Sequence, residues 1–305
     1  MGGNAQLVVY NSTFWLLYSL KTENYVLMKI YGKSFLIIFV FLLLTSSLQV
    51  TAQKTGMQSS TMNYGENISY DIYFKWGLIM SRAGDAIFSY NKDNSVTNAF
   101  SCYKMSFKTA KFFDNFFKMR DTLTCYLDND SRLIYSRKGS DEGGYYSVDE
   151  LKFSYGAENT TIHSLRYTPS RIRVDTTFFV TGDVSDLLGA AYYLRGIDRN
   201  NLQSGDRFPL IIAIGRDLVK MQFVYQNQSI VEHGNVKYNT RYFKLDIFDD
   251  AFESTSASAE VWVGDDDNFL PVKVRSKLKI GSAEIYYNSS SNLAHPLMCR
   301  IETKK

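Results

Sequence analysis

The chain is poor in proline, cysteine and histidine, and it lacks the short motifs that mark common enzymes. Its 305 residues include 4 prolines, 3 cysteines and 3 histidines. A nucleophile motif of the G-x-S-x-G type, a phosphate-binding loop and a dinucleotide fingerprint are all missing. None of the histidines has a second ligand type at metal-site spacing. The sequence therefore predicts no cofactor and favours a non-catalytic protein, although it leaves the question of catalysis open.

An excess of charge of one sign is also missing. The formal net charge is +3, from 34 basic and 31 acidic side chains. A chain this close to neutral has no electrostatic footprint for a polyanion, so we expect no nucleic-acid partner. What the chain does contain is aromatic side chains, with 22 tyrosines and 21 phenylalanines. Aromatic residues are enriched in strands, so this composition indicates sheet and argues against disorder.

Long hydrophobic runs are absent apart from one near the N-terminus, from Phe35 to Leu44. This run is shorter than the about 20 apolar residues that a membrane-spanning helix needs. A basic start precedes it and small residues follow it, which is the pattern of a secretory signal peptide cleaved after Ala52. The predicted organisation is 1–27 as a mis-assigned upstream start, 28–52 as the signal peptide and 53–305 as a single mature β domain.

The mature protein is therefore expected in the periplasm or outside the cell, with no stable membrane span after cleavage. No cysteine lies near the cleavage site, so the acylated cysteine of a bacterial lipoprotein is missing. Cys102 and Cys125 lie on two strand-like runs that flank a loop. A symmetric hairpin would place them opposite each other, which makes them the candidate pair for a disulfide in an oxidising compartment. The favoured interpretation is that both are buried free thiols.

Apolar and polar residues alternate with a period of two from residue 66 onward, beginning with Ile68, Tyr70 and Ile72, as in a half-buried strand. Further short runs of this kind, separated by turn residues, predict an antiparallel sandwich or half-barrel. One segment, 184–195, has helical spacing instead. We therefore predict a mainly β protein with two sheet-rich halves, 61–180 and 196–293, and one connecting helix near 184–195.

The alternation breaks in a basic and aromatic segment between Lys104 and Arg120. The spacing of its phenylalanines predicts a short helical turn or a loop plug with one aromatic face. If these rings are exposed, they form the kind of apolar patch that marks a lipid or partner site; if they are buried, they belong to the core. The candidate ligand-binding residues are Phe112, Phe113, Phe116, Phe117 and, at the end of the first strand, Trp76.

Two acidic clusters could support other chemistry. Asp265, Asp266 and Asp267 offer oxygen ligands to a hard cation, but they lack EF-hand spacing, and aspartates are common in tight hairpin turns. Asp141 and Glu142 could be paired catalytic carboxylates, but neighbours on a strand point to opposite faces. We interpret both clusters as turns, and the three aspartates are the only candidates for a metal site.

Several segments together resemble one known family. In chain order, these segments are 64–79 with 83–86, 112–114 with 117–123, 142–146, 186–195 and 261–272. The first of them begins Tyr64-Gly65-Glu66. Their order, from about Tyr64 to about Leu293, is similar to that of the domain-of-unknown-function 3108 family, exported β-rich proteins of Gram-negative envelopes. The chain departs from the family at Gly264, where a polar residue is usual, and at Phe269, where a basic one is. The resemblance implies export and a β fold, but no catalytic residue.

The function that these observations favour is a non-catalytic binding or structural module for an envelope component. Its partner would be a lipid, a glycan or an envelope protein, held on an aromatic-lined concave surface. The alternative is a carboxylate-dependent hydrolase of envelope polymers. That activity requires two acidic side chains from distant segments to converge roughly 5 to 10 Å apart in a cleft.

Overall fold

A computed structural model describes residues 61–115, 117–248, 259–278 and 281–301 of the chain. These residues all belong to one compact unit, Leu42–Lys305. The predicted signal peptide, its cleavage site and the residues before it lie outside the described residues, so they stay predictions. No helix among the described residues is long and apolar enough to cross a membrane.

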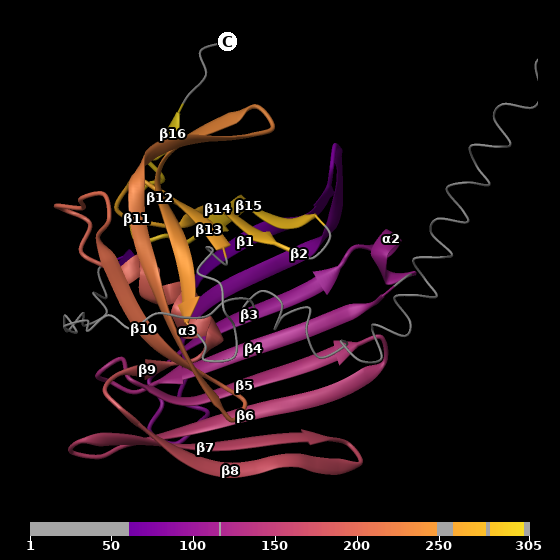
Figure 1. Cartoon of the computed structure of the whole chain (residues 1–305), viewed down its shortest axis with the longest axis vertical. Helices are drawn as coiled ribbons and strands as arrows, with labels where there is room; N and C mark the ends of the chain where they lie inside the picture. The colour runs from indigo at the N-terminus through magenta and orange to yellow at the C-terminus, as the bar shows by residue number, and fades with distance from the viewer. Residues whose placement is uncertain (1–60, 116, 249–258, 279–280, 302–305) are drawn as a thin grey trace, which may run out of the picture. The chain divides into compact units, whose positions relative to one another are not determined.

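Antiparallel strands make up most of this unit (Figure 1). Those of the first half are β1 (Glu66–Trp76), β2 (Ile79–Lys92), β3 (Ser101–Thr109), β4 (Met119–Leu127), β5 (Leu133–Glu142), β6 (Tyr145–Tyr155), β7 (Asn159–Thr168) and β8 (Arg171–Thr181). Those of the second half are β9 (Val184–Ser185), β10 (Arg207–Ile214), β11 (Asp217–His233), β12 (Val236–Phe248), β13 (Ala259–Gly264), β14 (Pro271–Lys277), β15 (Ser282–Ser291) and β16 (Arg300–Ile301).

All of these strands join into one sheet. Its order runs from β8 back to β1, then from β15 back to β9, with β16 paired to β12. The two halves meet where β1 pairs with β15, for example with Ile72 opposite Ile285. Figure 1 shows the sheet bending in a barrel-like way, so that β10–β12 run steeply across the direction of β3–β8. The prediction of a mainly β, antiparallel fold is confirmed, but the sandwich alternative is wrong, because the halves share one sheet.

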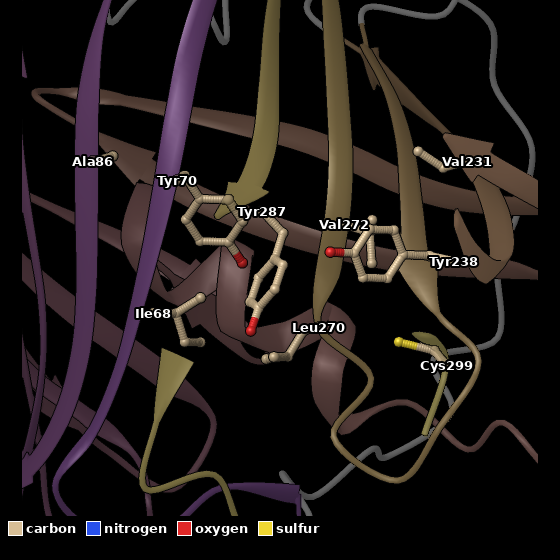
Figure 2. Packing of buried hydrophobic residues seen from close by; sticks show 9 residues of the cluster. All are labelled: Ile68, Tyr70, Ala86, Val231, Tyr238, Leu270, Val272, Tyr287 and Cys299. Carbon is tan, nitrogen blue, oxygen red and sulfur yellow. The ribbon is translucent and has the colours of Figure 1, made fainter. Parts of the chain in front are cut away.

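Side chains from both halves fill the core where β1 meets β15. Tyr70 and Tyr287 lie on these two strands, and their rings pack edge to face with centroids 6.3 Å apart. Figure 2 shows both rings among residues from β2, β11, β12 and β14, with Cys299 at the margin. Aromatic pairs of this geometry contribute beyond the area that they bury. The abundance of tyrosine and phenylalanine thus serves the core.

The connecting helix is confirmed, but it begins later than predicted. Val184 and Ser185 form the short strand β9, paired in parallel with β10. The helix proper is α3 (Leu187–Tyr193), which continues as a 3-10 turn, η2 (Leu194–Gly196). It begins after Asp186, whose side chain accepts a hydrogen bond from the Gly189 amide at 2.7 Å. An N-terminal cap of this kind stabilises a helix of only seven residues.

Helix α3 covers one face of the first half of the sheet, which we call the inner face. The ring of Tyr192 lies flat on the ring of Tyr103 of β3, with centroids 3.7 Å apart and an angle of 8°. Tyr103 lies opposite Cys125 of β4, and Cys125 lies opposite Ser136 of β5. The side chains of Cys125 and Ser136 therefore also belong to the inner face. Residues at alternate positions along each strand share this face.

The same register makes the predicted disulfide wrong. Cys102 lies opposite Tyr126, whereas Cys125 lies opposite Tyr103. A shift of one residue turns a side chain to the other face of a sheet, so the two thiols project in opposite directions. All three cysteines, including Cys299, are buried and free.

Candidate functional site

A buried ion pair lies at the centre of the described structure. Arg195 of η2 donates two hydrogen bonds to Glu66 at the start of β1, at 2.5 and 2.9 Å. Both side chains are at most 2% exposed. Burial alone would lower the pKa of Arg195, but the bonds to Glu66 outweigh it and raise that pKa. The pair joins two segments that are 129 residues apart in the chain.

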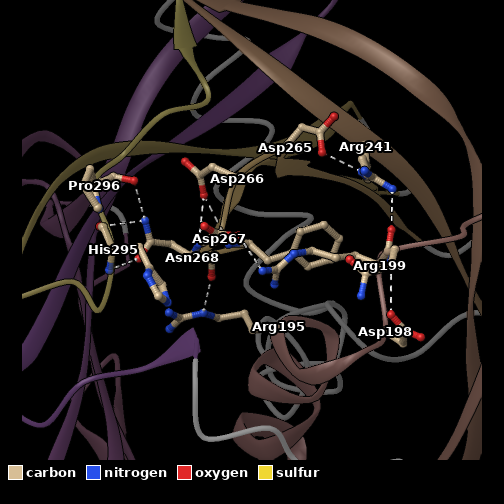
Figure 3. Close-up of polar contacts among 12 residues, drawn as sticks. Arg195, Asp198, Arg199, Arg241, Asp265, Asp266, Asp267, Asn268, His295 and Pro296 are labelled. Carbon is tan, nitrogen blue, oxygen red and sulfur yellow. Dashed lines mark hydrogen bonds and ion pairs between the residues drawn. The ribbon is translucent and has the colours of Figure 1, made fainter.

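The remaining donors of Arg195 extend this contact to the β13–β14 hairpin. Its Nε donates to the Asn268 carbonyl at 3.2 Å, and its Nη2 donates to the Thr61 carbonyl at 2.8 Å. The Asn268 side chain donates in turn to the carbonyls of His295 and Pro296, as Figure 3 shows. Thr61, Glu66 and Asn268 thus converge on one guanidinium. This group is buried and makes four hydrogen bonds inside the protein, so we interpret it as structural.

The three candidate metal ligands are each occupied by protein partners. Asp265 accepts from Arg241 at 2.7 Å, and Asp267 accepts from Arg199 at 2.8 Å. Asp266 accepts from three backbone amides of the hairpin and the C-terminal segment, including that of Asn268 at 3.0 Å (Figure 3). Among the described residues, no group of three or more histidine, cysteine, aspartate or glutamate side chains could hold a metal ion. The geometry is that of a hairpin turn tied down by its own carboxylates.

Both departures from the family pattern have a packing reason. A side chain at Gly264 would bring its Cβ within 2.7 Å of the Cys299 sulfur, so only glycine fits there without displacing the C-terminal segment. Phe269 is fully buried and packs edge to face against Phe243, with centroids 6.1 Å apart. A basic residue at that position would be buried without a partner.

A second buried carboxylate, Asp186, caps helix α3 and is also saturated. Besides the Gly189 amide, it accepts from the Ser136 hydroxyl at 2.6 Å and from the Cys125 thiol at 2.7 Å. Burial and the Asp186 charge raise the pKa of Cys125 well above its usual range. A reactive cysteine needs the opposite shift. Cys125 is therefore a structural thiol and not a nucleophile.

A third buried carboxylate differs from these two, and sequence reasoning missed it. Asp121 of β4 is 1% exposed, and no donor meets its oxygens in good hydrogen-bond geometry. Burial raises the pKa of Asp121, and the Lys138 ammonium, the hydroxyl of Ser140, directly opposite on β5, and the Asp141 amide offset part of that rise. The ammonium of Lys138 lies 4.0 Å from Asp121, too far to donate. We call Asp121, Ser140, Lys138 and Glu142 the Asp121 cluster.

One signal in the sequence could have found this cluster. The inward positions of β4 are Met119, Asp121, Leu123, Cys125 and Leu127, and all five are buried. An aspartate in the middle of an otherwise apolar row is exceptional for a half-buried strand. Glu142 is the member that sequence analysis assigned to a turn. It ends β5, and burial raises its pKa to about 7.

The candidate ligand-binding aromatics lie at one end of the strands. Because β1 to β8 are antiparallel neighbours, the turns after β1, β3, β5 and β7 all lie at this end, which Figure 1 shows. Eight of the fifteen exposed large apolar side chains among the described residues lie at these four connections, which we call the hairpin rim. They are Trp76, Leu78, Ile79, Met80, Phe112, Tyr145, Tyr146 and Ile172.

The phenylalanines of the 112–117 segment differ in their exposure. It includes α2 (Lys111–Asp114), so the predicted helical turn is confirmed. Phe112 is 61% exposed, whereas Phe113 and Phe117 are half-buried. The Phe117 ring lies so close to Gly143 that a Cβ there would be 3.1 Å away, which ties this segment to the β5–β6 turn. Phe116 lies outside the described residues.

Together these features define a class of protein: a mainly antiparallel β protein with a few buried carboxylates on its inner face and exposed apolar side chains at its hairpin rim. The chain belongs to the family described as a protein of unknown function, DUF3108, whose model matches residues 69–287. This match confirms the resemblance read from the sequence.

Comparisons with other proteins add little. No curated protein matches the chain. Among solved structures, the chain is similar to a β-barrel-like protein of domain of unknown function DUF1849 from Brucella abortus, with 11% identity, a TM-score of 0.48, and coverage of 74% of this chain and 96% of the other. It is also similar to a protein described as a putative lipoprotein from Parabacteroides distasonis, with 8% identity, a TM-score of 0.30, and coverage of 75% and 96%. Both TM-scores are below 0.5, so we base no argument on them.

Proposed function

We propose that this chain is a non-catalytic binding module that docks on an anionic lipid surface through its hairpin rim. The observation that carries the proposal is the concentration of exposed apolar side chains at four neighbouring turns. A scatter of single exposed apolar residues is normal, but a contiguous group marks a lipid or partner site. Leu78, at the tip of the β1–β2 turn, is fully exposed.

The charge of the rim favours lipid over the other envelope components. Exposed basic residues accompany the apolar ones at the same turns, namely Lys75, Lys108, Lys111, Lys118, Arg171 and Arg173. Three acids lie at these turns: Asp141 and Glu142 are half-buried, and Asp114 is ion-paired with Arg120 at 2.6 Å, which holds its pKa at about 2. Apolar side chains that enter a bilayer interface, together with basic groups that contact anionic head groups, are typical of peripheral lipid binding. A glycan or a neutral partner would not require this excess of positive charge.

The buried acids and thiol of the described residues support a binding role over catalysis. Cys125 is deactivated by burial, and Asp186 and Glu66 are saturated by hydrogen bonds. The hydrolase alternative requires two acids from distant segments, whereas the buried acids Asp121 and Glu142 lie on the adjacent strands β4 and β5.

The test is co-sedimentation of the exported protein with vesicles of phosphatidylglycerol or of phosphatidylcholine. We expect binding to phosphatidylglycerol only, weakened by salt. Ile79→Asp should reduce that binding about tenfold or more, because burying one large apolar side chain contributes about 1.5–3 kcal/mol. Ile230→Asp is the matched control, since Ile230 is equally exposed but lies on β11, outside the rim. Equal loss in both variants, or equal binding to both lipids, would refute the proposal.

A further inference from the structure

The sheet ends at β8, and the outer side of this strand has no partner among the described residues. β8 pairs with β7 on one side and is the last strand in the order, which Figure 1 shows at the margin of the sheet. Its odd-numbered residues, from Arg171 to Thr181, are all exposed, and Phe179 is 67% exposed. On such an edge the N–H and C=O groups of every second residue point away from the sheet, so the edge is a template for another strand.

The opposite end of the sheet is protected in ways that are usual for edge strands. β9 has only two residues and covers β10 at Ile211 and Ile212. The part of β10 before them contains Pro209, which has no N–H to offer a further strand. β8 has eleven residues and contains neither proline nor lysine. A bulge at Arg173 interrupts only its first part, so the stretch 174–181 stays regular and open.

The composition of this open stretch favours pairing with another strand. All of its residues except Asp175 are β-branched or aromatic, which are the types most enriched in strands. A long open edge of this kind is an aggregation site unless something covers it. Two copies that pair about a two-fold axis use both open edges, so assembly stops at the dimer. A second copy of this chain is therefore the partner that this edge fits.

We propose that two copies of this chain associate through β8, antiparallel and with Phe178 opposite its own counterpart, to form one continuous sheet. In a two-fold antiparallel pair, one residue lies opposite itself and the residues on either side pair symmetrically. With Phe178 at the centre, the whole stretch from Asp175 to Thr181 is paired. The two Phe178 rings are then cross-strand neighbours, and aromatic pairs of this kind stabilise a sheet.

The charges and rings of the strand make other registers less favourable. A pair centred on Asp175 would place two carboxylates opposite each other, which is destabilising. A pair centred on Thr177 would place Asp175 opposite the Phe179 ring, whose face carries negative partial charge. A pair centred on Thr176 or Phe179 would have a shorter ladder, because the regular stretch is limited to 174–181. The register centred on Phe178 places Asp175 opposite the Thr181 hydroxyl instead.

This dimer leaves the hairpin rim free. The rim lies at the Arg171 end of β8, whereas Phe178 lies toward the other end, so antiparallel pairing places the two rims at opposite ends of the dimer. The inference does not depend on lipid binding. We expect Phe179→Asp to bind phosphatidylglycerol vesicles as before and Ile79→Asp to dimerise as before, so either proposal can fail without the other.

Cysteine cross-linking tests the register. The three native cysteines are buried, so they do not compete with a cysteine introduced on β8. Phe178→Cys should form a disulfide-linked dimer under mild oxidation, because Cα atoms directly opposite each other lie about 4.5–5.5 Å apart, within reach of a disulfide. Thr176→Cys is the matched control on the same face, and its two thiols would be about 13 Å apart. Equal cross-linking in both variants, or none in a folded Phe178→Cys, would overturn the proposed pairing.

Sedimentation of the exported protein over a range of concentrations tests association itself. We expect an equilibrium between monomer and dimer without larger species. Phe179→Asp should raise the dissociation constant about tenfold, because the new carboxylate lies diagonal to Asp175 of the second copy and to its own counterpart. Ile230→Asp is the matched control, since Ile230 is 62% exposed but lies on β11, inside the sheet; its dissociation constant should stay within about twofold. A monomer at every concentration, or equal weakening in both variants, would refute dimerisation through β8.

Discussion

Glu66 and Asp121 are two buried carboxylates on one face of one sheet, and they differ in how well the protein satisfies them. Glu66 accepts two hydrogen bonds from Arg195, whereas no donor meets Asp121 in good hydrogen-bond geometry. Burial of a charge is costly in both places. At Glu66 the protein meets this cost with its own residues, and the pair joins β1, η2 and the β13–β14 hairpin. At Asp121 the Lys138 ammonium at 4.0 Å and the Ser140 hydroxyl offset only part of the cost, so burial still raises the pKa of this carboxyl.

The largest expected effect comes from breaking the satisfied pair. Glu66→Gln leaves the Arg195 charge buried and uncompensated, so the free energy of unfolding should fall by about 3–5 kcal/mol. Urea denaturation measures it. Glu232→Gln is the control, because its ion pair with Lys237 is exposed and such pairs contribute about 1 kcal/mol or less. A similar small change in both variants would remove the distinction between Glu66 and a surface acid.

The next effect is a pH dependence of stability that originates at Glu142, close to Asp121. The pKa of Glu142 is about 7 in the folded protein, against 4.5 as its usual value. The folded state therefore binds more protons than the unfolded state between these values, and stability should fall as pH rises from about 4.5 to about 7. The loss should be about 1–2 kcal/mol, since partial exposure screens the full shift.

Thermal denaturation across this pH range tests the assignment. Glu142→Gln should flatten the slope, while Asp141→Asn should keep it. A slope that survives in Glu142→Gln and disappears in Asp121→Asn would assign the titration to Asp121 instead. Its raised pKa gives the same sign.

A smaller effect of opposite sign should follow from neutralising Asp121. Asp121→Asn removes a buried charge that has no hydrogen bond of good geometry, so we expect a gain of about 1 kcal/mol in the free energy of unfolding at neutral pH. The measurement is the urea midpoint, with the slope of the transition held constant. A loss of stability would show that Lys138, from 4.0 Å, compensates the carboxylate better than its distance suggests.

The smallest effect concerns the acidic hairpin. Asp267 is 69% exposed and pairs only with Arg199. Asp267→Asn should leave the melting temperature unchanged within error, and addition of calcium should not shift it in either protein. A calcium-dependent rise in the melting temperature that Asp267→Asn abolishes would restore the metal hypothesis for this turn.

Sequence reasoning was most accurate where the evidence was local. Period-two alternation predicted the strands, and helical spacing predicted the helix near α3 and the turn at α2. The candidate disulfide between Cys102 and Cys125 was wrong, because it assumed a symmetric hairpin and the actual register differs by one residue, whereas the favoured interpretation of buried free thiols was right. The helix was expected to begin at 184, but Val184 and Ser185 form β9 and Asp186 is the cap.

The candidate site was only partly predictable. Trp76 and Phe112 were proposed as binding residues and both are exposed at the rim, but the binding itself stays a prediction. Glu142 was considered only with its neighbour Asp141, which points to the other face. Its relevant neighbour is Asp121, from the adjacent strand. The sequence of one strand alone does not determine which residues of another strand lie beside it.

The sequence by itself determined the mainly β character, the antiparallel hairpins, the connecting helix and membership of the family, because turns and periodicity depend on residues close in the chain. Only the tertiary structure decided that both halves form one sheet, that Glu66 meets Arg195, 129 residues away, and that Asp121 faces Ser140 and Lys138. These outcomes depend on which distant surfaces come together. Whether a buried charge has a partner is then a matter of three-dimensional position and not of residue type.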